Sequence, residues 1–204
     1  MGVALPSNRR MLQRGAGLLL IVCSLPGLIH GVRAGLAQHL YWRVKHGPDR
    51  NDAGEILRVG SRAHAIYPYN YNLCLWTAER ALSMANAAPA GPPREEAYEL
   101  VSRWCETGLA LNPYPRRLRF IKMHLLHRTS VAAALRYWEE YVDWHFWEPY
   151  NHAVLVELYA AAGRFAEAES ALRLAKGSRS FRPARERLEY LRNLAAENAA
   201  PRDP

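Results

Sequence analysis

The first 46 residues contain no aspartate or glutamate, so this segment carries charge of one sign only. Its six formally charged residues are Arg9, Arg10, Arg14, Arg33, Arg43 and Lys45. Six of the 27 basic residues of the chain therefore lie here, which leaves 21 basic against 19 acidic residues in the remainder. A nucleic-acid-binding protein needs a basic stripe on its folded part, and the tight cluster there is confined to Arg116, Arg117 and Arg119. We expect no nucleic-acid partner.

Cysteine is scarce, and the three cysteines, Cys23, Cys74 and Cys105, form no CxxC pair. This spacing argues against a zinc ribbon and a thioredoxin-type site. We expect Cys74 and Cys105 to be small buried residues of helices, and a disulfide between them stays open if the compartment is oxidising.

The motifs of the common catalytic classes are also missing, because the sequence contains no HExxH, GxSxG, P-loop or Rossmann fingerprint. His124 and His127 are three residues apart but lack a Glu or Cys at metal-ligand spacing. We expect no catalytic residues, no metal site and no cofactor, and we interpret the chain as a non-enzyme.

An uncharged stretch of 18 residues from Gly15 to Val32 follows three arginines. A helix needs about 17 to 20 such residues to span a bilayer, so we expect residues 15–34 to contact lipid. A cleavable signal peptide has the same layout. We favour an uncleaved signal anchor, because Arg33 precedes the expected cut and an amphipathic helix continues to residue 46. A single span behind a short basic tail favours a repeat domain on the periplasmic or extracytoplasmic side.

Three Pro-Tyr corners recur along the rest of the chain, at Pro68-Tyr69, Pro113-Tyr114 and Pro149-Tyr150, with a looser break at Pro183. Each follows helix-period apolar residues, and proline fits the break between one helix and the next. No segment alternates like a strand. The sequence predicts helices over residues 9–46, 52–66, 70–87, 94–111, 116–127, 131–146, 151–161, 165–177 and 183–198.

Residues 151–182 resemble the tetratricopeptide repeat (TPR) family. The matching positions are Leu155, Tyr159, Gly163, Phe165, Ala168 and Ala175, and the departures are His152, Val156 and Leu172. A degenerate copy lies 34 residues earlier, with Ile121, Leu125, Ala134, Trp138 and Tyr141 in register. Helical hairpins of this kind bury their apolar faces by stacking on one another.

The resemblance implies a groove lined by the first helices of successive repeats, which would accept a peptide or a helix. The residues expected to line it are Tyr69, Tyr71, Arg116, Arg119, Met123, Tyr150 and Glu157. A lining of arginine and tyrosine suits an acidic segment or one that carries a C-terminal carboxylate.

Seven aromatic residues crowd into positions 137–150, and they cannot all face the core of one helix. Trp144 and Trp147 are therefore candidate binding residues, since exposed aromatics dominate protein interfaces. The alternative is a secreted or periplasmic carbohydrate-binding module or enzyme that stacks sugar rings on this cluster.

Taken together, the sequence predicts an all-α protein with an N-terminal transmembrane helix, a short α-solenoid of TPR-like hairpins and a C-terminal capping helix. The expected parts are a basic tail at residues 1–14, a signal-anchor helix with its amphipathic extension at 15–46, the repeat domain at 47–198 and a disordered tail at 199–204. We interpret the chain as a membrane-anchored scaffold for another membrane or envelope protein, in a narrower form an accessory subunit of a membrane complex.

Overall fold

The computed structural model describes residues 7–46 and 52–199, and every regular element within these ranges is an α-helix. The helices are α1 (Ser7–His46), α2 (Ala53–Ile66), α3 (Tyr71–Ala87), α4 (Pro92–Leu111), α5 (Arg116–Thr129), α6 (Val131–Trp144), α7 (Pro149–Ala161), α8 (Phe165–Leu174) and α9 (Phe181–Ala199). The predicted all-α class is confirmed. Residues 1–6 and 200–204, at the ends of the two predicted tails, lie outside the described part.

Three prolines lie at the starts of helices. Pro92 and Pro149 are the first residues of α4 and α7, and Pro115 is the N-cap of α5. The first turn tolerates proline because its N–H groups have no intrahelical partner. For the same reason α4 and α7 begin two residues before the predicted starts at 94 and 151.

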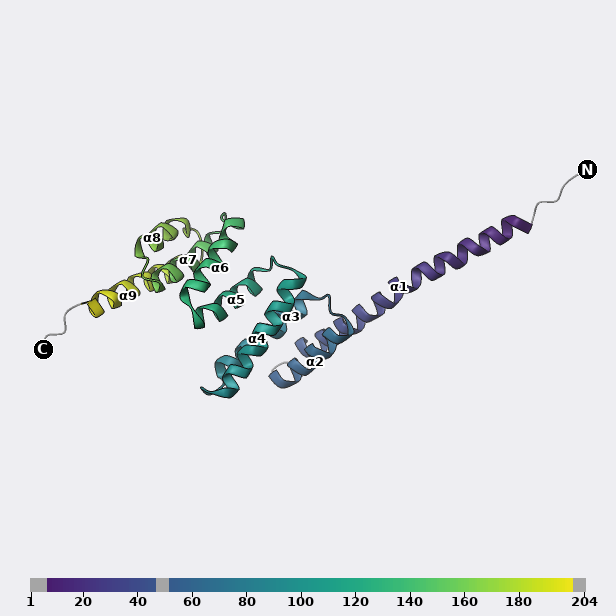
Figure 1. Cartoon of the computed structure of the whole chain (residues 1–204), viewed down its shortest axis with the longest axis horizontal. Coiled ribbons are helices and arrows are strands. Elements are labelled where there is room, and N and C mark those ends of the chain that lie inside the picture. The colour runs from purple at the N-terminus through teal and green to yellow at the C-terminus, as the bar shows by residue number, and fades with distance from the viewer. Residues whose placement is uncertain (1–6, 47–51, 200–204) are drawn as a thin grey trace, which may run out of the picture.

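Consecutive helices pack in pairs, and the pairs stack into an elongated array (Figure 1). The four hairpins are α1–α2, α3–α4, α5–α6 and α7–α8, while α9 packs on α7 and α8 and closes the last pair. Such stacking gives each hairpin a neighbour on which to bury its apolar face. The predicted solenoid with a C-terminal capping helix is therefore observed.

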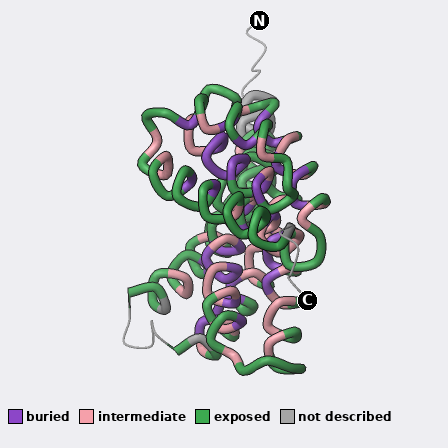
Figure 2. Tube along the Cα trace, turned by 90° about the vertical axis from the view of Figure 1, so that its left-hand side faces the viewer, coloured by how far each residue is buried: buried purple, intermediate pink, exposed green. Residues whose placement is uncertain are grey.

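Alanines and a glycine allow the helices of a pair to approach closely. Ala78 and Ala81 of α3 and Ala168 and Ala171 of α8 are buried. The two larger core clusters extend over α3–α5 and over α5–α9, and smaller ones join α1, α2 and α3. A Cβ atom added to Gly108 of α4 would lie 3.0 Å from the Cβ atom of Cys74 on α3. Figure 2 shows that buried segments lie where helices face one another, with exposed residues outside.

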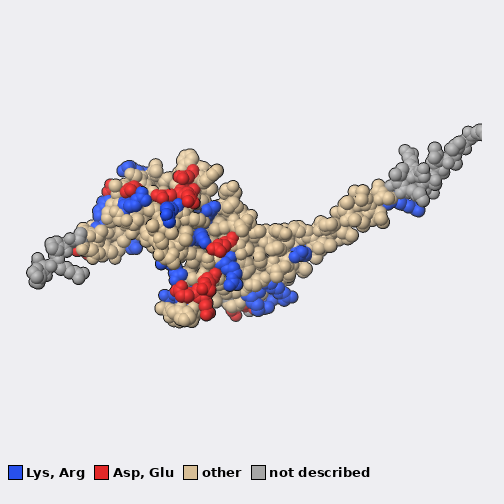
Figure 3. Space-filling view, viewed as in Figure 1, with Lys and Arg blue, Asp and Glu red and all other residues tan. Residues whose placement is uncertain are grey.

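The first helix consists of two different halves. From Arg14 to Leu36 no residue of α1 is buried, and most of this half projects away from the repeats (Figures 1 and 3) with few charged side chains. Ala37 is 2% exposed and packs with Ala63 and Leu73, while Tyr41 packs against Trp76. The second half of α1 is thus part of the repeat array, as the partner of α2.

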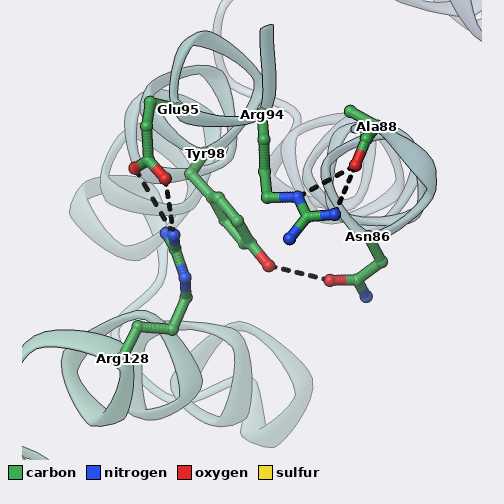
Figure 4. Close-up of polar contacts among 6 residues, drawn as sticks. All are labelled: Asn86, Ala88, Arg94, Glu95, Tyr98 and Arg128. Carbon is green, nitrogen blue, oxygen red and sulfur yellow. Dashed lines mark hydrogen bonds and ion pairs between the residues drawn. The ribbon is translucent and has the colours of Figure 1, made fainter. Parts of the chain in front are cut away.

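A polar cluster lies at the start of α4, beside the ends of α3 and α5 (Figure 4). The Arg128 guanidinium of α5 lies 3.2 Å from the ring centroid of Tyr98 on α4 and donates to Glu95. The Tyr98 hydroxyl donates to Asn86 of α3, and Arg94 donates twice to the Ala88 carbonyl oxygen. These contacts tie α3, α4 and α5 together.

Candidate functional site

The odd-numbered helices form one continuous face with three hollows along it, which we call the groove. The first hollow lies between α1 and α3, the second between α3, α5 and α7, and the third between α5, α7 and α9. Glu79 and Arg117 line both the first and the second hollow, and Phe120 lines both the second and the third. The groove therefore runs across the whole array, from α1 to α9.

The first hollow has a volume of about 390 Å³ and a wall supplied by the last turns of α1. The Lys45 ammonium lies 5.3 Å from the centroid of the Tyr41 ring and 5.6 Å from that of the Trp42 ring. Trp42 itself is half exposed. This arrangement presents a cation and an aromatic surface to any segment that enters the groove.

The second hollow combines arginine with tyrosine. The Arg116 guanidinium lies 4.8 Å from the centroid of the Tyr150 ring and forms an ion pair with Glu148. Arg117 forms an ion pair of 2.6 Å with Glu79 of α3. Burial raises the pKa of the Glu79 carboxyl despite the opposing charge of Arg117. The pairs bridge neighbouring helices, and Phe120 supplies apolar surface between them.

The third hollow contains the ionisable side chains His124, His127, Glu157 and Arg187. Burial raises the pKa of Glu157, and the charges of Arg187 and His127 only partly counter it. Burial lowers the pKa of His124, as do the neighbouring His127 and Arg128. This end of the groove thus holds a partly buried carboxyl beside basic side chains.

The structure brings four of the expected groove residues together, since Arg116, Met123, Tyr150 and Glu157 line the second and third hollows. Met123 is only 5% exposed and serves mainly as core. Tyr71 does not line a hollow of the groove and instead packs against the core cluster of α3, α4 and α5. Met123 therefore offers little surface to a ligand in the groove, and Tyr71 lies outside the groove.

Tyr69 and Arg119 also lie away from the groove. The Tyr69 ring is 5.9 Å from the His30 ring of α1, between centroids. The Arg119 side chain turns toward the corner before α5, where it donates to the Pro113 carbonyl oxygen. The helical period places Arg119 three positions from Arg116, close to the same face, but the corner carbonyl draws its side chain to the edge.

Trp144 and Trp147 belong to a separate exposed cluster at the corner between α6 and α7. Trp144 is 75% exposed and Trp147 is 66% exposed. Trp144 lines a hollow of about 240 Å³ together with Tyr114, Arg119, Glu140, Tyr141 and His145. The two tryptophans therefore remain candidate binding residues, at a surface distinct from the groove.

Sequence reasoning missed the contribution of α1 and α9 to the groove. By sequence alone, Trp42 and Lys45 fall in an amphipathic extension of the span, and Arg187 falls on the solvent side of a cap. The amphipathic pattern of residues 35–46 is the available signal, because an apolar stripe implies a packing partner. The sequence does not show that this partner is α2 and α3.

Within the described residues, no group of three or more His, Cys, Asp or Glu side chains is placed to hold a metal ion. Cys74 and Cys105 are free thiols with no exposed surface, so the disulfide left open by the sequence is not formed. What the groove can do chemically is donate hydrogen bonds, pair with carboxylates and pack aromatic rings.

No protein-family model and no curated protein matches this sequence. Among solved structures, the chain is similar to the crystal structure of a thermophilic TPR protein of Thermus thermophilus, with a TM-score of 0.60 and 16% sequence identity. The similarity covers 77% of this chain and 81% of that one. The chain has a TPR-like fold. Stacked helical repeats of this kind form extended concave surfaces.

Proposed function

We propose that this chain is a non-catalytic scaffold, anchored in a membrane by α1, that binds a segment of another membrane or envelope protein in its groove. The observation that carries the proposal is the continuity of the three hollows from α1 to α9. A continuous groove suits an extended or helical segment better than a compact small molecule.

The anchor rests on the length and composition of α1. Its Arg14–Arg43 part is long and apolar enough to cross a membrane, and none of its most apolar stretch is buried in the protein. A signal sequence near an N-terminus passes the same test. Two contacts of α1 with the α2–α3 corner favour retention, because cleavage near Arg33 would disrupt the hydrogen bond from Arg33 to the Ile66 carbonyl oxygen and remove the contact between His30 and Tyr67.

The expected occupant is a segment that carries carboxylates beside apolar side chains. The groove lining contains four basic side chains, Lys45, Arg116, Arg117 and Arg187, but only two acidic ones, Glu79 and Glu157. Arg117 already neutralises Glu79. Among the described residues, Lys45 and Arg187 form no ion pair. Guanidinium and ammonium groups in this setting recognise carboxylates through charge-assisted hydrogen bonds.

The alternative, a sugar-processing enzyme at the aromatic cluster, has less support. Glycoside hydrolysis requires two carboxylates directed at one bond. Glu139 instead accepts a hydrogen bond from the Tyr159 hydroxyl, and Glu148 pairs with Arg116. These carboxylates are engaged in holding helices together.

Site-specific photo-crosslinking in cells tests the scaffold. A photoreactive residue at Phe120, in the groove, should capture one partner protein, whereas the same residue at Arg136, exposed on α6, should not. The double variant Lys45→Glu and Arg187→Glu should reduce the Phe120 adduct by at least about tenfold, because each reversal turns an attraction into a repulsion. The charge-matched control is Arg136→Glu with Arg173→Glu. Equal adducts from both positions, or an adduct insensitive to the groove charges, would count against the proposal.

A further inference from the structure

Three corners of the array lie on one edge, and the projecting half of α1 leaves from the same edge. The Arg33 Nε atom donates to the Ile66 carbonyl oxygen at 2.7 Å, and the Tyr67 hydroxyl lies 3.1 Å from His30 Nε2. These contacts hold the α2–α3 corner against α1 at the level where its exposed apolar half begins. Because successive helices alternate in direction, the α4–α5 and α6–α7 corners lie at this edge too, as does the α8–α9 connection (Figure 1).

Exposed aromatic side chains gather at these corners. The five that are more than 60% exposed anywhere in the described chain are Tyr69, Tyr114, Trp144, Phe146 and Trp147. All five belong to the three corners or to the residue that ends the preceding helix. The turns at the opposite edge, residues 88–91, 129–130 and 162–164, contain no aromatic residue. The aromatic surface is therefore specific to the edge from which the apolar helix projects.

Basic residues accompany the aromatics at the middle corner. Arg116, Arg117 and Arg119 occupy the first turn of α5, which contains no acidic residue. Positive charge at a helix N-terminus opposes the helix dipole, and the contacts that Arg116, Arg117 and Arg119 make within the array offset this only in part. The Arg117 side chain is 71% exposed although it pairs with Glu79. This edge consequently offers both tyrosine or tryptophan rings and accessible guanidinium groups.

We propose that this corner edge, defined by residues 67–70, 112–117 and 144–148, lies against the headgroup layer of the bilayer into which α1 inserts. The inference rests on the membrane anchor of the proposed function. Tyrosine and tryptophan concentrate at the membrane–water interface, where the ring contacts the acyl boundary and the polar atom stays hydrated. Arginine adds attraction to anionic headgroups. The apolar half of α1 supplies the tether that keeps the edge at this depth.

This placement sets the direction of the groove. Helices α3, α5 and α7 run away from the corner edge, and the groove crosses them. With the corners on the bilayer, the groove runs along the membrane surface. It then fits a juxtamembrane segment of a partner that lies parallel to the bilayer.

Fluorescence quenching in liposomes of phosphatidylcholine with phosphatidylglycerol tests the proposal. An environment-sensitive probe is attached to the full chain at one cysteine at a time: native Cys23, or Tyr69→Cys, Trp147→Cys or Ala90→Cys in a Cys23→Ser background. Cys74 and Cys105 have no exposed surface and stay unlabelled in the folded protein. Ala90, exposed in the α3–α4 turn, is the matched control at the opposite edge. Circular dichroism of each labelled variant verifies that the helices are retained.

We expect a deep nitroxide lipid to quench the probe at Cys23, and a headgroup nitroxide lipid to quench the probes at 69 and 147 at least about threefold more than the probe at 90. Quenching at Cys23 with positions 69 and 147 no more quenched than 90 would overturn the edge contact and leave the anchor standing; the aromatic corners would then be a protein-binding surface. Absence of quenching at Cys23 would instead remove the anchor on which both proposals depend.

Discussion

The indole Nε1 of Trp138 donates a hydrogen bond of 3.0 Å to the backbone carbonyl oxygen of Asn151. This bond joins the middle of α6 to the first turn of α7 across the aromatic corner. Asn151 in turn donates from its side-chain amide to the His145 carbonyl oxygen at 3.1 Å. Both Trp138 and Asn151 are fully buried, so the corner that carries the exposed tryptophans is held from inside the core.

Replacing Trp138 should destabilise the array more than any change at the exposed tryptophans. Trp138→Ala should cost about 3–5 kcal/mol through the cavity it leaves. Trp138→Phe keeps most of the volume and should cost about 1–3 kcal/mol, because the Asn151 carbonyl loses its donor. Chemical denaturation in detergent, followed by circular dichroism, measures these differences. Trp144→Ala should stay within about 0.5 kcal/mol of the parent, and a loss as large as that of Trp138→Ala would refute the packing described.

Gly108 controls the approach of α3, α4 and α5. A Cβ atom there would lie 2.8 Å from Leu118 Cδ1 and 3.0 Å from the Cys74 Cβ atom. Gly108→Ala should therefore destabilise the protein by about 1–3 kcal/mol in spite of the better helix propensity of alanine. The control is Gly54→Ala, where the nearest atom is 3.4 Å away and no such loss is expected. Equal melting temperatures for the two variants would contradict the close contact.

The carboxyl of Glu157 should make stability depend on pH. Because burial raises its pKa above the ordinary value of 4.5, the folded chain holds this proton at a higher pH than the unfolded chain does. The ionised form thus costs stability at neutral pH, and the cost disappears as the pH falls below 4.5. Glu157→Gln should raise the melting temperature at about pH 7, and the gain should vanish at about pH 4.

Glu167 provides a control of opposite sign. A hydrogen bond from Arg164 lowers its pKa, so its charged form stabilises the fold above the ordinary value of 4.5 and this contribution is lost on acidification. Glu167→Gln should therefore lower the melting temperature at about pH 7 and have little effect in acid. If Glu157→Gln and Glu167→Gln shifted the melting temperature in the same direction at neutral pH, the surroundings described for one of the two carboxyls would be contradicted.

The two buried thiols should resist modification in the folded protein. Burial raises the pKa of Cys74 to about 11 and that of Cys105 to about 12. Little thiolate is present at about pH 8, and neither sulfur is accessible. Iodoacetamide at this pH should leave both unmodified by mass spectrometry of the native chain, and should label both after denaturation with reductant absent. Native labelling at either position, or a mass consistent with a disulfide, would contradict the structure.

Much of the fold could be predicted from local signals in the sequence. Proline at positions 68, 113 and 149 separates the helices, and alanine marks where they touch, because both effects act within a few residues. The order of helices, the hairpins and the cap follow from these signals. The exact starts of α4 and α7 do not follow, since a proline can lie just before a helix or in its first turn.

The faces of the helices are harder to predict than their extents. Periodicity groups Arg116 with Arg119, but it does not show that the Pro113 carbonyl oxygen draws Arg119 to the corner. Tyr69 is expected in the groove, whereas the structure places its ring near His30 of the first helix. Contacts of this range depend on how whole hairpins stack, and one sequence contains no local pattern for them.

The unbroken course of α1 has a mechanical consequence. One helix runs from Ser7 to His46, so its apolar half and the wall of the first hollow share a single axis. Each residue added to that axis turns everything beyond it by about 100° and advances it by about 1.5 Å. The number of residues between Leu28 and Ala37 therefore fixes how the repeat domain is rotated about the α1 axis, relative to the apolar half. A single inserted residue would rotate the repeat domain about this axis and turn the groove toward another direction, while every groove side chain stays unchanged.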